Sequence, residues 1–465
     1  MKRIFIYLTI LAATLLSVCD SGALEVRITG ERLSIQADQV PLQSVLRRLA
    51  DLGIRVRIDP KLNPKVFASF ENWDMQRGLA LLLNSFGYAL IWESVEGPSG
   101  PVSKLVEIQV FERDRKESMK PLGTRRTLSI ERNPRNGSLF VKGEVLLRLR
   151  PGISLLEFKE ILSQIGGTLV EAYGALGIYK IRLPENADIL SLVEQITRHP
   201  RIARAEPNYA YPISRPDYHA DAATVSAPDI FNIPLQEGAA PVAILDTGLR
   251  PDSGLEGLVL ASVDALNPAD PISDSAGHGT QMALIAAGVV KPQGVSADFG
   301  TRSPIIPIKA FDDNNVTSNF NLMSSIDFAI KHGARVMSLS WSAETKSDFL
   351  KDALGYASSR GLIIVASAGN DPTGKPVYPA AYSSVIGVGA LNPDGKPWKR
   401  SNYGDFVMLY APGFATLPVG YMGDPGTYAG TSISAAFVAN IIANYLSRNP
   451  DAKRGDVLKA LSSLL

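Results

Sequence analysis

Two short apolar runs in the C-terminal half of the chain end abruptly in polar residues, and this pattern restricts the fold most strongly. The run within "PVAILDTG" ends at Asp246, and the run within "GLIIVASAGND" ends at Gly369 and Asn370. Continuous apolar runs of this length, bounded by turn residues, are typical of strands buried on both faces of a parallel sheet. We therefore expect an α/β fold with a mostly parallel sheet flanked by helices. The carboxyl ends of its strands would share one edge, where functional groups gather.

Two further segments predict helices that begin with a reactive side chain. In "SAGHGTQMALIAAG", His278 stands where a helix of small residues starts. In "YAGTSISAAFVANIIANYL", a glycine-led turn puts Ser432 in the first turn of a helix that is apolar on nearly every face. Such a helix is expected to be buried, with only its N-terminus open. A lone histidine in such a place is more often structural, so the interpretation depends on the combination of residues.

The combination predicts nucleophilic catalysis. A serine hydroxyl attacks well only when a neighbouring base takes its proton, and histidine is suited to that role near neutral pH. A buried Asp246 would hold the second ring nitrogen of His278 and stabilise the imidazolium. The backbone N–H of Ser432 and the side-chain amide of Asn370 would stabilise the oxyanion of the tetrahedral intermediate. We expect Asp246, His278 and Ser432 to be catalytic and Asn370 to form the oxyanion hole.

The order of these four residues, each inside its own motif, resembles the subtilisin-like serine proteases (the subtilase or S8 family) over residues 241–465. The resemblance implies a serine-type endopeptidase that acts on polypeptide substrates through an acyl-enzyme and needs no cofactor. The segment "GARVMSLSW" resembles the family's substrate-binding strand, and "YPAAYSSVIGVGA" resembles the wall of its S1 pocket. By the same resemblance, the substrate-binding residues are Ser338, Leu339, Ser340, Ser367, Ala368, Gly369 and Val377.

Some positions depart from the family pattern. No proline follows Ser432 within four residues, Gln281 stands where a second histidine is usual, and Ser340 replaces a common glycine. Val377 stands where the S1 pocket often has glycine, and it predicts a shallow pocket that prefers small P1 side chains such as alanine. Alternatively, loop differences move Val377 out of the pocket. The chain ends soon after the serine helix, which we interpret as a trimmed catalytic domain within residues 236–465.

Residues 142–213 alternate strand and helix signals in the order βαββαβ, the split βαβ arrangement. The segments "LGIYKIRLPENAD" and "HPRIARAEPNYAY" resemble the propeptide domain of subtilisin-like proteases. The resemblance implies a domain that assists folding and then acts as an intramolecular inhibitor. Its C-terminal tail, rich in proline, would block the cleft as an extended strand. We expect processing between Tyr211 and Phe231.

Residues 26–94 carry two rounds of strand and helix patterns, which predict a small two-helix α+β domain. The segments "VPLQSVLRRLADLGIRVRIDP" and "LALLLNSFGYALIW" resemble the short N-terminal domain shared by secretins and TonB-dependent receptors. That resemblance implies docking to another envelope protein, and a generic α+β domain is the alternative. Residues 95–141 are expected to be a linker, because positions 112–135 hold eight Lys or Arg and four Asp or Glu.

The first 23 residues combine two basic residues with an apolar run, which is typical of an export signal. Two outcomes are open: cleavage after Ala23, or lipidation of Cys19 within a segment that resembles a bacterial lipobox. Because Cys19 is the only cysteine of the chain, we favour a lipid anchor. The lipobox resemblance implies that Asp20 would then favour retention at the inner membrane. Either outcome predicts a periplasmic or cell-envelope protein.

Charge and cysteine content exclude other classes. The chain has 47 Lys and Arg against 46 Asp and Glu, so it has no global positive field for binding nucleic acid. One cysteine allows no intrachain disulfide, no multi-thiolate zinc site and no iron–sulfur cluster. Positions 312–315 can be interpreted as a calcium loop or a polar turn. Their spacing matches no defined ligand set, so we expect a turn and no metal site.

Two functions from different classes remain. The first is an exported serine endopeptidase made as a zymogen. The second is a catalytically silent or permanently inhibited envelope protein that acts through residues 26–94. The complete triad favours the first function, whereas the missing proline after Ser432 keeps the second one open.

Overall fold

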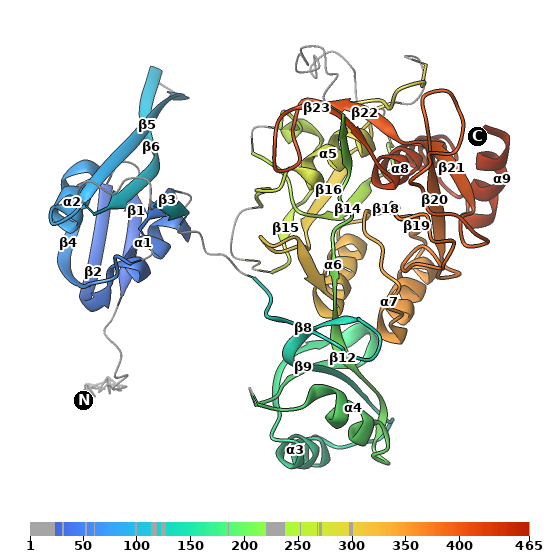
Figure 1. Cartoon of the computed structure of the whole chain (residues 1–465), viewed down its shortest axis with the longest axis horizontal. Helices are drawn as coiled ribbons and strands as arrows, with labels where there is room; N and C mark the ends of the chain where they lie inside the picture. Colours follow the sequence, from blue (N-terminus) through green and yellow to red (C-terminus); the bar gives the residue numbers. More distant parts are fainter. Residues whose placement is uncertain are drawn as a thin grey trace, which may run out of the picture. The chain divides into compact units, whose positions relative to one another are not determined.

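The computed structural model describes residues 24–29, 32–51, 54–59, 61–97, 100–112, 119–121, 127–184, 186–219, 238–251, 253–266, 268, 272–296 and 301–464. The expected signal segment, with Cys19, lies outside the described residues. Part of the expected processing region, residues 220–231, lies outside them as well. The chain divides into two compact units, Met1–Arg125 and Arg126–Leu465 (Figure 1).

The first unit holds two helices and two small sheets around one apolar core. Helix α1 (Leu42–Asp51) buries Val45, Leu46 and Leu49 at the helical spacing seen in the sequence. The sheets have the orders β1-β2-β4 and β5-β6-β3-β7. The other elements are β1 Glu25–Thr29, β2 Arg32–Pro41, β3 Arg55–Ile58, β4 Lys65–Asp74, α2 Met75–Leu83, β5 Gly87–Gly97, β6 Gly100–Phe111 and β7 Lys120–Pro121.

The structure corrects the expectation that residues 95–141 form a linker. Strand β6 pairs antiparallel with β5 along its whole length. It buries Leu105, Ile108 and Val110 in the core of the first unit, and its register with β5 shifts between Ile91 and Trp92. Strand β8 (Ile130–Arg132) then pairs with the first strand of the next sheet.

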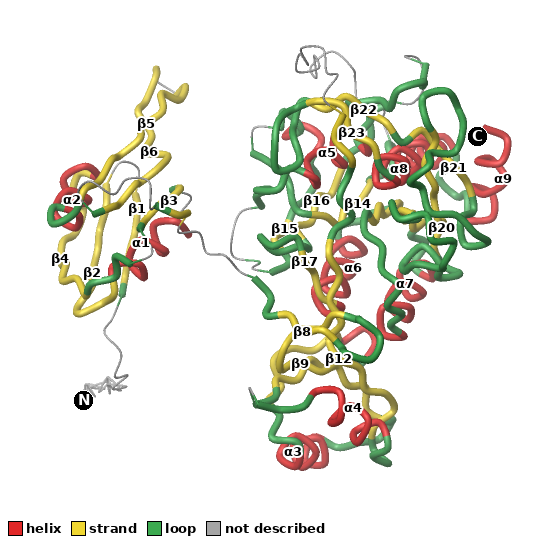
Figure 2. The backbone as a smooth tube through the Cα atoms, in the orientation of Figure 1, coloured by secondary structure: helices red, strands yellow, loops and turns green. Residues whose placement is uncertain are grey.

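In the second unit, residues 130–212 supply every strand but one of an antiparallel sheet. The strand order is β10-β11-β9-β12-β17, and β8 pairs with β9. The elements follow the expected βαββαβ order, with α3 and α4 on one face of the sheet (Figure 2). Strand β17 (Val316–Ser318) comes from much later in the chain and extends the sheet through β12. The other elements are β9 Leu139–Leu149, α3 Leu155–Gln164, β10 Thr168–Tyr173, β11 Ile178–Arg182, α4 Ile189–Thr197 and β12 Ile202–Pro212.

The rest of the second unit is built on a seven-stranded sheet with the order β15-β16-β14-β18-β19-β20-β21. Every neighbouring pair of strands is parallel. The strands are β14 Val242–Asp246, β15 Val263–Asp264, β16 Ile305–Lys309, β18 Val336–Leu339, β19 Ile363–Ser367, β20 Val385–Leu391 and β21 Leu409–Pro412. The helices are α5 His278–Ala286, α6 Asn319–Lys331, α7 Asp348–Ser359, α8 Thr431–Arg448 and α9 Arg454–Leu464.

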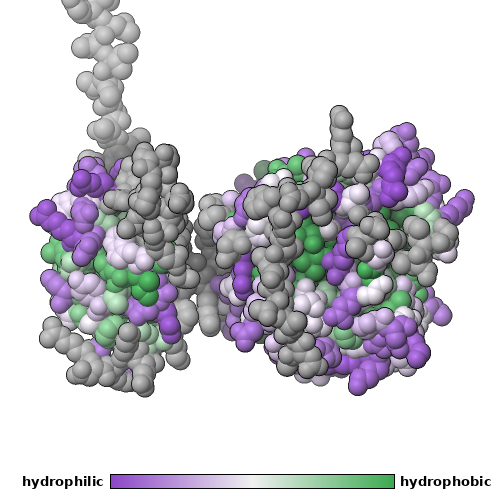
Figure 3. All heavy atoms as spheres, turned by 90° about the horizontal axis from the view of Figure 1, so that it is seen from above, coloured by the Kyte–Doolittle hydropathy of each residue, from purple (hydrophilic) through white to green (hydrophobic). Residues whose placement is uncertain are grey.

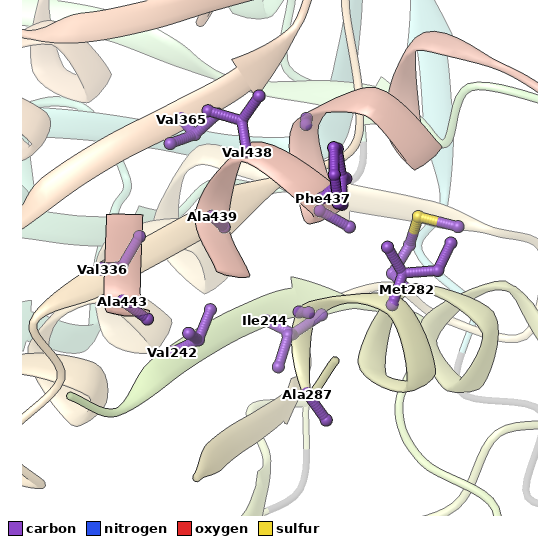
Figure 4. Close-up of a cluster of buried hydrophobic side chains, with 14 of the residues drawn as sticks. Val242, Ile244, Met282, Ala287, Val336, Val365, Phe437, Val438, Ala439 and Ala443 are labelled. Carbon is purple, nitrogen blue, oxygen red and sulfur yellow. The ribbon is translucent and has the colours of Figure 1, made fainter. Parts of the chain in front are cut away.

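Strand β14 shows why its sequence is apolar without interruption. Val242 and Ile244 belong to the core formed with α5 and α8, shown in Figure 4, whereas Ala243 and Leu245 belong to the core formed with α6 and α7. Both faces of the sheet are therefore covered by helices, as expected for a parallel sheet. The fold class expected from the sequence is confirmed.

The second unit also contains a small third sheet, with the strand order β13-β23-β22. Its strands are β13 Asp217–His219, β22 Phe414–Leu417 and β23 Gly426–Ala429. Strand β23 leads directly into α8, so this sheet lies next to the start of the serine helix. None of the helices in the described part of the chain combines the length and the apolar character that a membrane crossing needs.

Candidate active site

The predicted acid and base meet as expected. Asp246 is the last residue of β14, and His278 is the first residue of α5. Both side chains are buried, and Nδ1 of His278 lies 2.7 Å from Oδ1 of Asp246. Gly277 precedes the helix with φ 88°, and a Cβ there would lie 2.1 Å from the carbonyl oxygen of Gly420. Glycine is needed at this position, because the loop before His278 is left-handed and tightly covered.

Ser432 differs in one respect from the expectation. It lies in the first turn of α8, and α8 packs against α5. Its hydroxyl donates to the carbonyl oxygen of Ser340 at 3.3 Å, while Nε2 of His278 is buried without a hydrogen-bond partner. The contact between the predicted acid and the predicted base is therefore formed, but the hydrogen bond between His278 and Ser432 is not. The carbonyl of Ser340 competes for the hydroxyl in this conformation.

The side chain of Asn370 is fixed next to the serine. Gly369, with φ 93°, turns the chain after β19 and presents Asn370 to the start of α8. The Oδ1 atom of Asn370 accepts from the backbone N–H of Thr431 at 3.0 Å and from its hydroxyl at 2.8 Å. The amide Nδ2 is thereby aimed outward, and it donates to the carbonyl oxygen of Arg215 at 2.9 Å. A backbone carbonyl thus occupies the position expected for an oxyanion.

The predicted substrate-binding residues gather around this point. Ser338 and Leu339 end β18, and Ser340 follows them with its carbonyl on Ser432. A Cβ on Gly369 would lie 2.8 Å from Oγ of Ser342 and 3.9 Å from Cγ2 of Val377. Val377 therefore borders the same space as Gly369. The predicted substrate-binding residues are all buried: Ser338, Leu339, Ser340, Ser367, Ala368, Gly369 and Val377.

The end of β12 and the residues that follow it, up to residue 219, pass through this region. Residues 210–212 of β12 pair with β17, and the N–H of Ile213 donates to the carbonyl of Asn315 at 2.9 Å. The hydroxyl of Ser214 lies 3.3 Å from that of Ser342. Arg215 then reaches Asn370, and the chain continues as β13, which pairs with β23. The segment therefore contacts Ser342, Asn370 and the strand that precedes α8.

One side chain of this segment fills a deep position. Tyr211 is fully buried, and its hydroxyl donates to Oδ1 of Asn319 at 2.8 Å. The amide of Asn319 donates in turn to the hydroxyl of Ser347 at 2.8 Å. Burial raises the pKa of Tyr211 well above its ordinary value, so the hydroxyl stays protonated as a donor. No local sequence pattern indicates this contact, because it joins residues more than a hundred positions apart.

The sheet of residues 130–212 also caps two helices of the second unit. The carboxylate of Glu206 accepts from the N–H of Asp348 at 2.9 Å and from the hydroxyl of Ser347 at 2.6 Å, at the start of α7. The side-chain oxygen of Asn208 accepts from the N–H of Phe320, at the start of α6. These acceptors satisfy N–H groups that a helix cannot pair internally.

Sequence reasoning missed other residues of the site. Tyr421 sets the edge of its ring against the imidazole of His278, with centroids 5.8 Å apart. Burial raises the pKa of Tyr421, against the opposing effect of the nearby Arg215 side chain. Asp274 is buried and accepts hydrogen bonds from residues on both sides of the acid–base pair. A carboxylate three residues before a left-handed glycine is a weak sequence signal, so neither residue could be singled out.

The described residues contain no group of three or more His, Cys, Asp or Glu arranged to hold a metal ion. Asp312, considered above as a calcium ligand, accepts from the N–H groups of Asn314 and Val316 at 2.9 Å. Its other oxygen accepts from the N–H of Leu128 at 2.6 Å. These bonds describe a polar turn between β16 and β17.

Three features define the class of serine hydrolases. They are a parallel sheet covered on both faces, an aspartate–histidine pair at its edge and a serine at the start of a buried helix. The comparisons with known proteins agree with this class. Residues 239–462 match the model of the Subtilase family, and residues 130–208 match the model of the Fervidolysin N-terminal prodomain.

The similar proteins are proteases. Thermitase of Thermoactinomyces vulgaris is 31% identical over 237 residues, which cover 49% of this chain and 82% of that protein. The thermophilic serine proteinase of Bacillus sp. (strain AK1) is 27% identical over 316 residues, covering 65% of this chain and 78% of that protein. The crystal structure of fervidolysin from Fervidobacterium pennivorans has a TM-score of 0.56 at 24% identity, covering 71% of this chain and 58% of that one.

The chain belongs to the subtilase family. It is a serine endopeptidase with a fervidolysin-like prodomain, and is therefore made as a zymogen.

Proposed function

We propose that Ser432, His278, Asp246 and Asn370 carry out peptide hydrolysis. The hydroxyl of Ser432 attacks the scissile carbonyl while Nε2 of His278 takes its proton. Asp246, bonded to Nδ1 at 2.7 Å, fixes the tautomer and stabilises the imidazolium. His278 then protonates the leaving amine, and a water activated by His278 hydrolyses the acyl-enzyme. Rotation of the Ser432 side chain away from the carbonyl of Ser340 starts the sequence.

The observation that supports these roles best is the contact of Asn370 with Arg215. An amide locked by Thr431 donates to a backbone carbonyl at 2.9 Å, next to the serine. An oxyanion hole needs this geometry, because its donors must be fixed before charge develops. The N–H of Ser432, in the first helical turn, has no intrahelical acceptor and supplies a second donor.

We propose that residues 206–219 inhibit the enzyme while they remain attached. The segment lies along the site like a substrate, from the buried Tyr211 to the carbonyl of Arg215. Its contacts with α6, α7 and β17 add to the attachment, through residues such as Glu206. An activating step must therefore displace or cut this segment before another polypeptide can enter.

We also propose a preference for small P1 side chains. A Cβ on Gly369 would lie 3.9 Å from Cγ2 of Val377 and 2.8 Å from Oγ of Ser342. The hydroxyl of Ser342 in turn lies 3.3 Å from that of Ser214 in the inhibitory segment. A β-branched side chain in this position reduces the depth of the pocket. Cleavage profiling tests the proposal: enrichment of alanine and serine at P1 supports it, and a strong preference for phenylalanine or tyrosine contradicts it.

For the first unit we propose binding rather than catalysis, in the cell envelope. The basic and apolar residues of the first 23 positions support export, and the position of Cys19 supports a lipid anchor. The likeness of residues 26–94 to secretin and TonB-receptor domains supports docking to an envelope protein. Phe67 is 68% exposed, and hydrophobic surface is visible on the smaller unit in Figure 3. Intact-mass measurement of the native protein tests both the processing and the acylation.

The experiment that tests the catalytic proposal compares two serine variants of one helix. Ser432→Ala should abolish peptide hydrolysis and self-cleavage without unfolding the chain. Ser434→Ala is the matched control, because the Ser434 hydroxyl bonds to Ala411 within the core. Hydrolysis retained by Ser432→Ala would overturn the assignment. A wild-type chain that stays inactive after the prodomain is cut by another protease would support the inhibited envelope protein instead.

A further inference from the structure

A second buried carboxylate lies beside the acid–base pair and serves no role in the mechanism above. Asp274 is 5% exposed and sits in the loop before α5. Its Oδ1 accepts from the hydroxyl of Thr247 and from the N–H of Gly277, each at 2.8 Å. Its Oδ2 accepts from the N–H of Thr280 at 2.8 Å and from its hydroxyl at 2.7 Å.

These bonds join the two segments that carry the acid and the base. Thr247 directly follows Asp246, and its hydroxyl also accepts from the N–H of Gly279 at 2.8 Å. The hydroxyl of Thr280 accepts from the N–H of Arg250, in the turn that follows β14. The end of β14 and the start of α5 are thus linked on both sides of His278, with Asp274 as the common acceptor.

The start of α5 needs such an acceptor. The residue before the helix, Gly277, has no side chain to pair with the free N–H groups of the first turn. Because glycine also allows a wide range of backbone angles, the loop would otherwise leave His278 poorly fixed. Asp274 supplies the missing acceptor from three residues upstream of the glycine.

We propose that Asp274 is a positioning residue that holds His278 in register with Asp246. It acts through Thr247 and Thr280 and touches no reacting atom. The inference rests on the proposed roles of the triad. Displacement of a catalytic base by about 1 Å can lower the rate by up to about a hundredfold. We therefore expect Asp274 to affect turnover as well as folding.

The first test is Asp274→Asn in the full chain. An amide can accept at one oxygen only, so at least one backbone N–H loses its partner. We expect kcat/KM to fall about 10- to 100-fold, mostly through kcat. The acid limb of the pH–rate profile should move to lower pH, because a less closely held Asp246 stabilises the imidazolium less. Rates are expressed per active site titrated with a fluorophosphonate, which excludes misfolded molecules.

Asp274→Asn also removes a negative charge near His278, which by itself would move the acid limb in the same direction. A second variant that changes no charge is therefore needed. Thr247→Val keeps the shape of the side chain and leaves the charges of Asp246 and Arg215 unchanged, together with the Tyr421 ring beside His278. It removes the bridge from Asp274 to Gly279. We expect a smaller loss of kcat with a shift of the acid limb in the same direction.

Two further variants complete the design. Thr280→Ser keeps the hydroxyl and should retain near wild-type kcat. Asp312→Asn is the matched control, since Asp312 is also buried and accepts backbone N–H groups, in a turn outside the triad. It should lower thermal stability without moving the pH profile. The proposal is overturned if Asp274→Asn and Thr247→Val lose stability but keep kcat and the pH profile per titrated site. Absence of fluorophosphonate labelling in the wild type would instead contradict the triad itself.

Discussion

The amide of Asn370 shows how one side chain is fixed for two partners. Its oxygen is held by both donors of Thr431, so its nitrogen can point only towards the space where Arg215 now lies. A group fixed in this way loses no freedom when charge develops on a substrate oxygen. The same bonds explain why the donor sits beside the serine: Thr431 directly precedes Ser432.

Replacement of Asn370 by alanine should reduce kcat by about a hundredfold or more, with little change in KM, as known for an oxyanion-hole donor in subtilisin. The reason is that the lost hydrogen bond forms fully only in the transition state. Steady-state kinetics on a peptide substrate measures the effect. Asn440→Ala, which removes a buried amide from the contact of α8 with α5, is the control and should lower the melting temperature instead. An equal loss of kcat in both variants would contradict the role of Asn370.

At the residue scale, the sequence predicts which side chains form the site better than it predicts their hydrogen bonds. Asp246 and His278 could be paired because each follows from a local motif and the chemistry requires the contact. The hydroxyl of Ser432 could not be placed, because the competing carbonyl of Ser340 comes from the residue after β18, far from Ser432 in the sequence. Asp274 was missed because its hydrogen-bond partners lie up to 27 residues away in the sequence, and no local pattern indicates them.

At the scale of elements, strong sequence patterns predict the positions of helices and strands well, whereas amino-acid composition predicts them poorly. The run ending at Asp246 predicts β14 with its last residue at the sheet edge. The charge count of residues 95–141 predicts a linker, yet Leu105, Ile108 and Val110 in that range give β6 a buried face. A few apolar residues that reach the core therefore decide the structure of this segment, despite the neighbouring charges. The pairing of β12 with β17 joins two domains and follows from neither sequence alone.

Tyr211→Phe should weaken the inhibitory segment. The change leaves Oδ1 of Asn319 buried without its donor, which costs about 1–3 kcal/mol. Self-cleavage should therefore begin sooner than in the wild type, and the onset is followed by gel electrophoresis over time. Tyr218→Phe is the control, because Tyr218 is 50% exposed and its loss should leave the onset unchanged. Equal or slower onset in Tyr211→Phe would refute the proposed attachment.

Docking of the prodomain on α7 should depend on pH. Burial raises the pKa of Glu206, although Ser347 and the N–H of Asp348 donate to it. The docked state then holds a proton more tightly than the released state. Its stability is complete below the usual carboxyl pKa and declines as pH rises through the raised pKa.

The measurement for this effect is the release of the prodomain from a Ser432→Ala chain that has been cut after the prodomain by another protease. Release should increase with pH across the window above the usual carboxyl pKa of Glu206. Glu206→Gln, which cannot titrate, should flatten the dependence. A steeper dependence in Glu206→Gln, or release favoured by acid, is incompatible with this account.

At the scale of the whole molecule, each unit has a core of its own. The first unit buries the cluster around Leu46, whereas the second unit has separate clusters on the two faces of its parallel sheet. The residues proposed to be catalytic all belong to the second unit. The motifs predict a separate N-terminal domain but not where it ends, since β6 extends it beyond residue 94. They also do not predict that the prodomain and the catalytic part form one compact unit.

A chain without residues 24–125 should therefore keep its protease activity. We expect an unchanged kcat/KM on a peptide substrate and an unchanged melting temperature for the second unit, measured by calorimetry. Loss of hydrolysis in a folded chain of this kind would show that the first unit contributes to catalysis, which disagrees with the position of Asp246, His278 and Ser432.

The most direct measurement of the central claim is labelling of the full chain with a fluorophosphonate, followed by peptide mass spectrometry. The account predicts one adduct, on the oxygen of Ser432, which appears faster once residues 206–219 are displaced. It also predicts that His278→Ala slows the labelling strongly. An adduct on another serine, or no adduct after removal of the prodomain, would contradict the account.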